Sequence, residues 1–258
     1  MKKLSIVKIG GNVIDDNRSL KEFISEFAEM DGAYILVHGG GKVASQIGAL
    51  MGIEPQMIDG RRITDAETLD LVTMVYGGLT NKKIVAQLQA QGINAIGLTG
   101  ADGNTLLAHR RPKKEIDYGF VGDISAEGVN IDLIQSLLQQ ELSPVFCALT
   151  HDGKGQMLNT NADTIASVLA VALSEAFEVD LVYCFEQPGV LSDFEKKTVI
   201  AELNSSNYAE FKKEGVINSG MIPKIDNAFD ALKAGVKTVR IIHFSDLKKN
   251  VAGTLIRL

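Results

Sequence analysis

Short apolar runs alternate with longer segments of helical periodicity along most of this chain. The runs Leu4–Ile9 and Ala33–Val37 are rich in β-branched and other apolar residues, whereas Ser19–Met30 carries apolar residues at helical spacing. Such runs are typical of buried strands, and the periodic segments are typical of helices that cover them. The alternation therefore predicts an α/β fold with a mainly parallel, covered sheet.

The same pattern predicts the order of the remaining elements. Further strands are predicted at 94–98, 143–148, 181–185 and 238–242, and further helices at 43–51, 64–76, 80–91, 131–139, 161–173, 208–213 and 222–234. Thr64 and Glu67 have the spacing of a capping box with Thr64 as the N-cap, and Gly77-Gly78 is expected to weaken or kink its helix. The stretch 106–128 is polar and turn-rich with alternation at 118–124, which predicts a small antiparallel excursion near the substrate. We place a lobe boundary near 174–179.

Glycine turns follow the first two strands directly. Gly10-Gly11 ends the first strand and Gly39-Gly40-Gly41 ends the second, each just before a helical segment. Glycine lets backbone N–H groups approach a ligand with no Cβ in the way, and a helix N-terminus favours an anion. Lys8 adds a full positive charge at the end of the first strand. We therefore expect the two turns to form two walls of one phosphate or carboxylate site.

The composition narrows the class of protein. The chain has 258 residues and a formal net charge of -6, which argues against a general nucleic-acid binder. No apolar run approaches the ~18–20 residues of a membrane span, and a strand begins directly after Met1 with no room for a signal peptide. We therefore expect a cytoplasmic protein without nucleic-acid or membrane partners. Cys147 and Cys184 lie in apolar runs and are interpreted as buried thiols rather than as a disulfide or metal ligands.

Polar residues at predicted strand ends and helix starts are the candidates for chemistry, because open α/β sheets bind ligands at that rim. Arg62 is placed to pair with a substrate carboxylate, and Asn159 to bond a substrate amide or carboxylate. Asp163 is placed to orient one or two lysines, and Lys224 to bind phosphate. Each also has an ordinary explanation, as a solvated cation or as a polar group at a helix N-terminus that Asn161 caps.

Other phosphate and cofactor motifs fit less well. The Walker pattern is absent, and the triple glycine satisfies G-x-G-x-x-G/A with Asp59 in the position of a ribose acid, but a lone match is weak. A nicotinamide site would explain neither the first glycine turn nor Lys8. The four histidines give no metal-ligand spacing, and His38 is interpreted as a structural histidine rather than a general base.

Together these motifs resemble those of the amino acid kinase family over essentially the whole chain, and within it the members that phosphorylate an N-acylglutamate. The resemblance rests on the number, order and spacing of the segments 8–11, 38–41, 60–64, 97–103, 159–163 and 220–224. It implies a three-layer sandwich with a central, mostly parallel sheet. It also implies an N-terminal lobe, residues 1–174, that binds the N-acylglutamate and dimerises, and a C-terminal lobe, residues 175–258, that binds ATP.

The implied activity is ATP-dependent phosphorylation of the γ-carboxylate of N-acetyl-L-glutamate, the second step of arginine biosynthesis. This carboxylate is already a nucleophile, so charge neutralisation and positioning replace a general base. By resemblance, the catalytic residues are Lys8, Lys224, Asp163, Gly11 and Gly41, with Asp163 holding both lysines. The N-acylglutamate would be bound by Gly40, Gly41, Arg62 and Asn159, and the nucleotide by Glu186, Gly189, Leu191 and Asn218. ATP would bring Mg²⁺, which is held mainly by phosphates rather than by a metal site of the protein.

The chain departs from the family pattern in its nucleotide segment and at its start. Glu186 stands where family members commonly have Asp, and Pro188 where they have a small residue, which affects the expected ribose and adenine contacts. Arginine-inhibited members have an extra helix before the first strand, whereas here the strand begins near Met1. We therefore expect no inhibition by arginine, and we expect a homodimer. Residues 70–76 are the expected dimer face; alternatively, their apolar side chains belong to the ordinary core of one subunit.

Three alternatives stay open. A succinyl group in place of acetyl would need only a roomier or more basic pocket. The same fold could act on another small anion such as aspartate, glutamate, carbamate or UMP, against which Arg62 and Asn159 argue. A non-catalytic amino-acid or nucleotide sensor would be expected to lack Lys8, Lys224 or Asp163, and all three are present.

Overall fold

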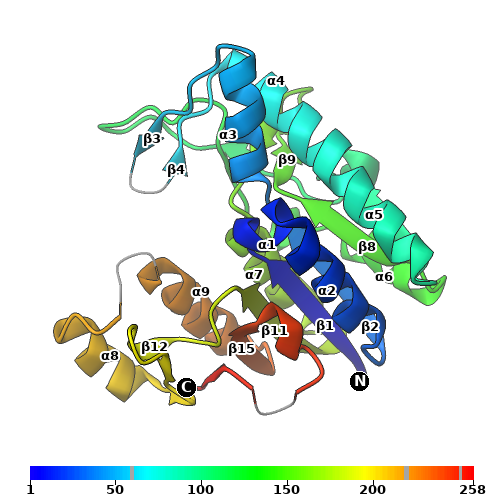
Figure 1. The fold of residues 1–258 in the computed structure, drawn as a ribbon. Helices are drawn as coiled ribbons and strands as arrows, with labels where there is room; N and C mark the ends of the chain where they lie inside the picture. The colour runs from blue at the N-terminus through cyan, green and yellow to red at the C-terminus, as the bar shows by residue number, and fades with distance from the viewer. Residues whose placement is uncertain (59–60, 218–220, 250–251) are drawn as a thin grey trace.

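An eight-stranded sheet forms the centre of the molecule (Figure 1). The computed structural model describes residues 1–58, 61–217, 221–249 and 252–258, apart from the side chain of Pro223. The strands are ordered β14-β16-β15-β11-β1-β2-β8-β5, and only the β15–β16 pairing in this described sheet is antiparallel. They are β1 (Lys2–Ile9), β2 (Ala33–His38), β5 (Ala95–Leu98), β8 (Ser143–Cys147), β11 (Phe177–Phe185), β14 (Glu202–Leu203), β15 (Thr238–His243) and β16 (Thr254–Ile256). The predicted mostly parallel α/β sheet is confirmed.

Helices cover both faces of this sheet, so the predicted three-layer sandwich is confirmed as well. They are α1 (Gly11–Asp15), α2 (Asn17–Ala28), α3 (Gly41–Leu50), α4 (Ala66–Val72), η1 (Thr73–Thr80), α5 (Asn81–Ala90), α6 (Ile131–Gln139), α7 (Ala162–Leu173), α8 (Ser205–Lys213) and α9 (Ile222–Lys233). Ile6 of β1 packs in one core cluster with Leu169 of α7, whereas Val7 packs in another with Phe23 of α2. Successive residues of β1 therefore face opposite layers, as in a strand buried on both sides.

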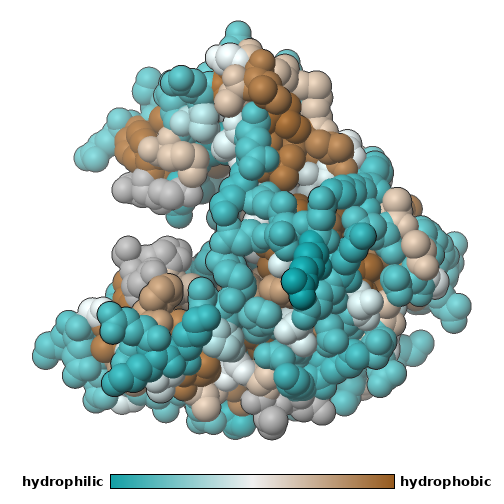
Figure 2. Space-filling view, viewed as in Figure 1, coloured by the Kyte–Doolittle hydropathy of each residue, from teal (hydrophilic) through white to brown (hydrophobic). Residues whose placement is uncertain are grey.

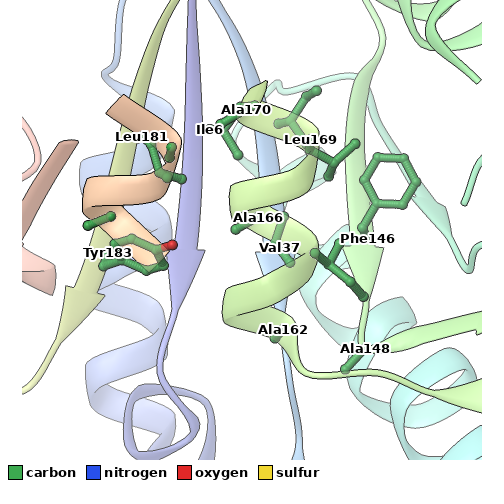
Figure 3. Packing of buried hydrophobic residues seen from close by; sticks show 14 of the residues in the cluster. Ile6, Val37, Phe146, Ala148, Ala162, Ala166, Leu169, Ala170, Leu181 and Tyr183 are labelled. Carbon is green, nitrogen blue, oxygen red and sulfur yellow. The ribbon is translucent and has the colours of Figure 1, made fainter. Parts of the chain in front are cut away.

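Small residues let α7 lie close to the sheet. Figure 3 shows Ala166 and Ala170 of α7 beside Val37 and Ile6, with all four in one buried cluster. Alanine fills little space between a helix and a sheet, so the helix backbone can approach the strands closely. This packing places the N-terminus of α7 near the carboxyl end of β1 (Figure 3).

Short antiparallel pairs are added around the main sheet. They are β3 (Met57–Ile58) with β4 (Arg61–Arg62), β6 (His109–Arg110) with β7 (Gly122–Asp123), β9 (Leu149–His151) with β10 (Met157–Asn159), and β12 (Leu191–Asp193) with β13 (Thr198–Val199). The β6–β7 pair confirms the predicted excursion, whereas the sequence pattern did not identify the other three. Isolated bridges join Val121 to Asn159 and Thr64 to Gly119. The excursion therefore lies against β10 and against the entry to α4.

The N-cap of α4 differs from the prediction. Asp65 rather than Thr64 caps the helix, since its side chain accepts a hydrogen bond from the Thr68 N–H at 2.8 Å. The Thr64 N–H donates to the Tyr118 carbonyl at 3.0 Å, and the Thr64 carbonyl accepts from the Phe120 N–H at 2.7 Å. Thr64 is therefore engaged in strand-like bonding with the excursion, and the cap falls one residue later.

The helix that starts at α4 continues through Gly77-Gly78. Thr73–Thr80 forms a π-helical segment, η1, that leads directly into α5. At the expected weak point, the helix thus changes locally from α-helical to π-helical hydrogen bonding instead of ending. Such π segments occur frequently at functional sites, and η1 carries Tyr76 to the pocket described below.

The surface is hollowed between two parts of the chain. Figure 2 shows a recess that lies, in the view of Figure 1, between the region of β3 and β4 and the region of α8 and α9.

Cys147 and Cys184 are buried free thiols, as predicted. No helix in the described ranges has the combination of length and apolar character that a membrane crossing needs.

Candidate active site

Asp163 lies between two lysine ammonium groups. Its Oδ1 is 2.7 Å from Lys8 Nζ and its Oδ2 is 2.5 Å from Lys224 Nζ. The side chains of Lys8 and Asp163 are only 9% and 8% exposed, whereas that of Lys224 is 24% exposed. The structure therefore brings together, from β1, α7 and α9, the three charged residues that the sequence analysis singled out.

The secondary structure explains why these residues meet. Lys8 is two residues beyond Ile6 and shares its face of β1, which is the face covered by α7. Asn161 caps α7 as predicted, because its side chain accepts a hydrogen bond from the Asp163 N–H at 2.8 Å. The Tyr183 hydroxyl of β11 donates to the Asp163 carbonyl at 3.4 Å. The first turn of α7 is thus anchored to the sheet directly beside Lys8.

The buried charges perturb one another strongly. Burial acts to raise the pKa of Asp163, but the ammonium groups of Lys8 and Lys224 outweigh it and lower this pKa to about 2. Burial lowers the pKa of Lys8 below its ordinary value; Asp163 opposes this effect and Lys224 adds to it. With two ammonium groups for one carboxylate, the cluster keeps an excess positive charge that an incoming anion can neutralise.

A pocket of about 250 Å³ opens beside this cluster. Both glycine turns border it, as the sequence pattern predicted. Its lining includes Lys8, Gly11, Gly39, Gly40, Gly41, Arg61, Arg62, Tyr76, Arg111, Val121, Asn159, Thr160 and Asp163. All the residues predicted to bind the acceptor therefore line one pocket together with two of the three charged residues.

The second glycine turn packs against Tyr76. A Cβ at Gly40 would lie 2.9 Å from Tyr76 Cδ1, so only glycine leaves room for the ring at this position. Gly41 begins α3, and its carbonyl accepts a hydrogen bond from Arg62 Nη2 at 2.9 Å. The same nitrogen donates to Ser45 Oγ at 2.8 Å. These bonds hold the Arg62 guanidinium at the first turn of α3, in the wall of the pocket.

Asn159 and Arg62 are joined through Thr64. Asn159 Nδ2 donates to Thr64 Oγ1 at 3.0 Å, and that hydroxyl donates to the Arg62 carbonyl at 3.2 Å. Asn159 is the last residue of β10, and Arg62 is the last residue of β4. A buried hydroxyl therefore couples two pocket residues that lie far apart in the sequence.

His38 is a structural histidine, as predicted. It is fully buried, and burial lowers its pKa to about 4. Asn81 Nδ2 lies 3.0 Å from His38 Nε2 and donates to the Val145 carbonyl at 2.9 Å. Because the amide nitrogen is a donor, Nε2 accepts and Nδ1 carries the proton, which it donates to the Gly39 carbonyl at 2.7 Å. A neutral histidine bonded on both sides supports the glycine turn and is not free to act as a base.

The residues predicted to bind the nucleotide are only partly placed. Asn218 lies outside the described residues. Asn12 of α1 donates a hydrogen bond to Glu186 Oε1, so Glu186 adjoins the first glycine turn. A Cβ at Gly189 would lie 2.8 Å from a hydroxyl oxygen of β16, and Leu191 is half-buried at the start of β12. These contacts explain the local packing, and the nucleotide-binding roles stay predictions.

Tyr76 and Arg111 line the pocket but were not identified as candidates from the sequence. The sequence pattern places Tyr76 in the helix 64–76 and in the expected dimer face 70–76. Arg111 lies in the excursion and forms a bidentate ion pair with Asp123, with nitrogen–oxygen distances of 2.6 to 3.2 Å. These hydrogen bonds raise the pKa of Arg111. Its Nη1 is buried without a hydrogen-bond partner among the described residues. The only sequence signal for Arg111 was its place in a segment predicted to approach the substrate.

The arrangement suits the handling of anions. The Lys8 ammonium group, the guanidinium groups of Arg61, Arg62 and Arg111, and the first turns of helices α1, α3 and α7 surround the pocket, and each of these stabilises negative charge. Groups of this kind can hold two anionic reactants together and neutralise the charge that moves between them.

Comparisons with known proteins agree with this chemistry. The model of the amino acid kinase family matches residues 3–243. The chain is 59% identical over 249 residues to the acetylglutamate kinase of Cytophaga hutchinsonii, covering 96% of this chain and 94% of that protein. It is 52% identical over 256 residues to the acetylglutamate kinase of Bacteroides thetaiotaomicron, covering 99% and 98%. The solved structure of smu.665 from Streptococcus mutans UA159 matches with a TM-score of 0.82 at 28% identity, covering 99% of each chain.

The family resemblance inferred from the motifs is thereby confirmed. Because the similarity spans nearly the whole chain and includes the pocket and its charged cluster, this chain belongs to the amino acid kinase family.

Proposed function

We propose that this chain uses ATP to phosphorylate the γ-carboxylate of N-acetyl-L-glutamate, the second step of arginine biosynthesis. The observation that carries the proposal is the pairing of Asp163 with both Lys8 and Lys224 beside a pocket bordered by two glycine turns. Relatives that are 52% and 59% identical over nearly the whole chain bear the name acetylglutamate kinase, which supports it.

The acceptor would occupy the pocket in the N-terminal lobe, residues 1–174. Its α-carboxylate would pair with Arg62, its amide would bond Asn159, and the N–H groups of Gly40 and Gly41 would complete the contacts. The support is geometric, since these residues line one pocket and Arg62 is coupled to Asn159 through Thr64. The γ-carboxylate would then lie toward Lys8.

The nucleotide would bind to the C-terminal lobe, residues 175–258. Glu186, Gly189, Leu191 and Asn218 would line the adenine and ribose, and the γ-phosphoryl group would lie between Lys8 and Lys224. The N–H groups of Gly11 and Gly41 would contact this phosphoryl group. The bond from Asn12 to Glu186 supports this arrangement, because it ties the nucleotide segment to the first glycine turn.

Magnesium would enter with ATP as part of the substrate. Both oxygens of Asp163 face ammonium groups, and Glu186 accepts a bond from Asn12, so these carboxylates are engaged by protein donors. Mg²⁺ readily keeps phosphate and water ligands, and this donor set fits an ion held by the phosphates of ATP.

The reaction needs no general base at this site. A γ-carboxylate has an ordinary pKa of about 4.3 and is ionised near neutral pH, so its oxygen can attack the γ-phosphorus without losing a proton. The bond from that phosphorus to the ADP oxygen breaks, and the ammonium groups neutralise charge on the transferring group and on the leaving phosphate. This account agrees with a neutral, fully bonded His38.

Arg111 favours a second acceptor, N-succinyl-L-glutamate. A succinyl group differs from acetyl in ending in a carboxylate. Arg111 lines the same pocket as Arg62, and its Nη1 is a buried donor that lacks a partner within the described ranges. A buried unpaired N–H is costly, and a substrate carboxylate would satisfy it.

The test is ADP release with MgATP and N-acetylglutamate, N-succinylglutamate or free glutamate, with hydroxylamine to trap the acyl phosphate. We expect turnover with an N-acyl substrate to exceed that with glutamate by about 100-fold or more. Absence of turnover with all three substrates, in protein that binds ATP, would overturn the proposal.

The choice of acyl group is tested with Arg111→Gln. If Arg111 binds a succinyl carboxylate, this change lowers turnover with N-succinylglutamate far more than turnover with N-acetylglutamate. Arg110→Gln is the matched control, because Arg110 is the exposed neighbour and does not line the pocket. An unchanged ratio of the two activities in Arg111→Gln would exclude this role.

A homodimer formed through the face that includes residues 70–76 completes the proposal. Met74 and Leu79 both lie in η1. Their side chains are large and apolar, yet the two residues are 53% and 51% exposed. Burial of such side chains against a second copy would remove apolar surface from water.

A further inference from the structure

We infer that Phe185 is a positioning residue for phosphoryl transfer, because its ring supports the ammonium groups of both Lys8 and Lys224. The inference rests on the proposed kinase function and adds to it a residue that the sequence analysis did not single out.

Both ammonium groups lie near the same aromatic ring. Lys8 Nζ is 5.1 Å and Lys224 Nζ is 5.2 Å from the centroid of the Phe185 ring. Both distances fall within the range of about 6 Å over which a ring face attracts a cation. Asp163 contacts the same two nitrogens. Each ammonium group is therefore held by a carboxylate and by an aromatic ring.

The register of the sheet places Phe185 in this position. β1 and β11 are parallel neighbours, with Lys8 opposite Tyr183. Phe185 is two residues beyond Tyr183 and shares its face of β11, which is turned toward α7. The ring therefore lies on the same side of the sheet as Lys8 and Asp163.

Gly10 leaves room for this ring. A Cβ at Gly10 would lie 3.1 Å from Phe185 Cδ1, which is closer than most real contacts of a Cβ atom. The Gly10 N–H donates to the Cys184 carbonyl at 3.0 Å, so the end of β1 is bonded to the residue before Phe185. The first glycine turn and the ring are thus packed as one unit.

The ring acts on the lysines differently from Asp163. A carboxylate accepts the N–H bonds of an ammonium group and cancels its charge, so it competes with a phosphate for the same donors. A ring face attracts the cation while leaving its N–H groups available, and it keeps water away on that side. Phe185 can therefore hold Lys8 and Lys224 in place while their N–H groups turn from Asp163 to the phosphoryl oxygens.

The test measures Lys8 directly in the free protein, without substrate. Competitive labelling with acetic anhydride across a pH series, followed by mass spectrometry of the peptides, gives the pKa of Lys8. Phe185→Leu keeps an apolar side chain but removes the ring, so this pKa should fall by about half a unit to one unit. Phe185→Tyr keeps the ring and should leave it unchanged.

Kinetics provide the second readout on the same variants. In Phe185→Leu we expect kcat to fall by about tenfold with the KM for ATP nearly unchanged, and the alkaline limb of kcat/KM to move to lower pH. Phe177→Leu is the matched control, since it makes the same change at the other end of β11, away from Lys8 and Lys224. Thermal unfolding verifies that each variant is folded, and Phe185→Met replaces Phe185→Leu if the latter is not.

The outcomes separate this inference from the function on which it rests. An unchanged pKa of Lys8 in Phe185→Leu, or an equal fall in Phe185→Tyr, would overturn the role of the ring. A fall in kcat without a pKa change would also overturn it, because it indicates a merely structural residue. If the pKa of Lys8 shifts as expected but the wild-type chain has no kinase activity, the ring still supports the ammonium group and the proposed function fails.

Discussion

Lys8 of β1 and Asp163 of α7 form a buried ion pair with 2.7 Å between Nζ and Oδ1. Neither residue can move far, because Lys8 is part of the central strand and the Asn161 cap and the Tyr183 hydroxyl anchor the turn that carries Asp163. The pair leaves the second carboxylate oxygen for Lys224. The position of both ammonium groups therefore depends on one carboxylate beside the pocket.

Removal of either ammonium group should abolish most of the activity. We expect Lys8→Ala and Lys224→Ala each to lower kcat by about 10²- to 10³-fold, since each removes a positive charge from the developing transition state. Coupled measurement of ADP release gives kcat, and circular dichroism verifies the fold. Lys154→Ala, at an exposed position in the turn between β9 and β10, is the control and should keep normal turnover. A folded Lys224→Ala protein with near-normal turnover would contradict the assigned role.

Loss of the shared carboxylate should destabilise the fold. Asp163→Asn leaves the buried ammonium group of Lys8 next to the partly exposed one of Lys224 without a counter-charge. We expect the free energy of unfolding to fall by about 3 to 5 kcal/mol, as for other buried ion pairs that lose one partner. Urea unfolding measures the change. A loss below about 1 kcal/mol would show that Lys8 and Lys224 do not depend on Asp163 for compensation.

The same carboxylate should make stability sensitive to acid. The pKa of Asp163 is lowered from its ordinary value of 3.8 to about 2 in the folded state. The ionised form is thus favoured by folding, and its contribution is fully present above about pH 4 and lost as the pH falls toward 2. Urea unfolding at pH 5, 4 and 3 should show this loss in the wild type and a weaker dependence in Asp163→Asn. Parallel curves for the two proteins would exclude Asp163 as the source.

Any side chain at position 40 should weaken the binding of the N-acylglutamate. In Gly40→Ala the new Cβ would lie 2.9 Å from the Tyr76 ring, so the ring or the glycine turn must shift. We expect the KM for the N-acylglutamate to rise at least about tenfold, with a smaller effect on the KM for ATP. Gly78→Ala is the matched control, because a Cβ at that position in η1 meets nothing within 4 Å. Equal kinetics for the two variants would contradict the argument from close packing.

A charge on the proposed dimer face should give a monomer. Met74→Glu places a carboxylate where we propose apolar contact between two copies, and light scattering after gel filtration measures the mass. Phe194→Glu changes an apolar residue that is 71% exposed outside that face, and should leave the mass unchanged. A wild-type protein that elutes as a monomer at micromolar concentration would refute the dimer.

Local patterns predicted much of the site. The runs around Lys8 and before the triple glycine are strands with turns at their ends, because apolar β-branched residues and glycine impose those conformations locally. Asn161 could be identified as a cap from its place before an apolar helix, since the capping bond forms within three residues.

Non-local contacts account for the errors and omissions. The cap of α4 moved to Asp65 because the excursion occupies the backbone of Thr64, and no pattern near Thr64 reports that contact. Tyr76 and Arg111 were overlooked for the same reason, since a helix stripe and a polar loop do not reveal which residues face a pocket.

The sequence by itself determined the order of the longer strands and of most helices, the glycine turns and the candidate charges, because these follow from propensities and periodicities over a few residues. The tertiary structure decided which of those charges meet. Lys8, Phe185 and Asp163 come together only through the parallel register of β1 with β11 and the close packing of α7. Such contacts depend on the summed burial of the whole core, and no short segment of the chain encodes that sum.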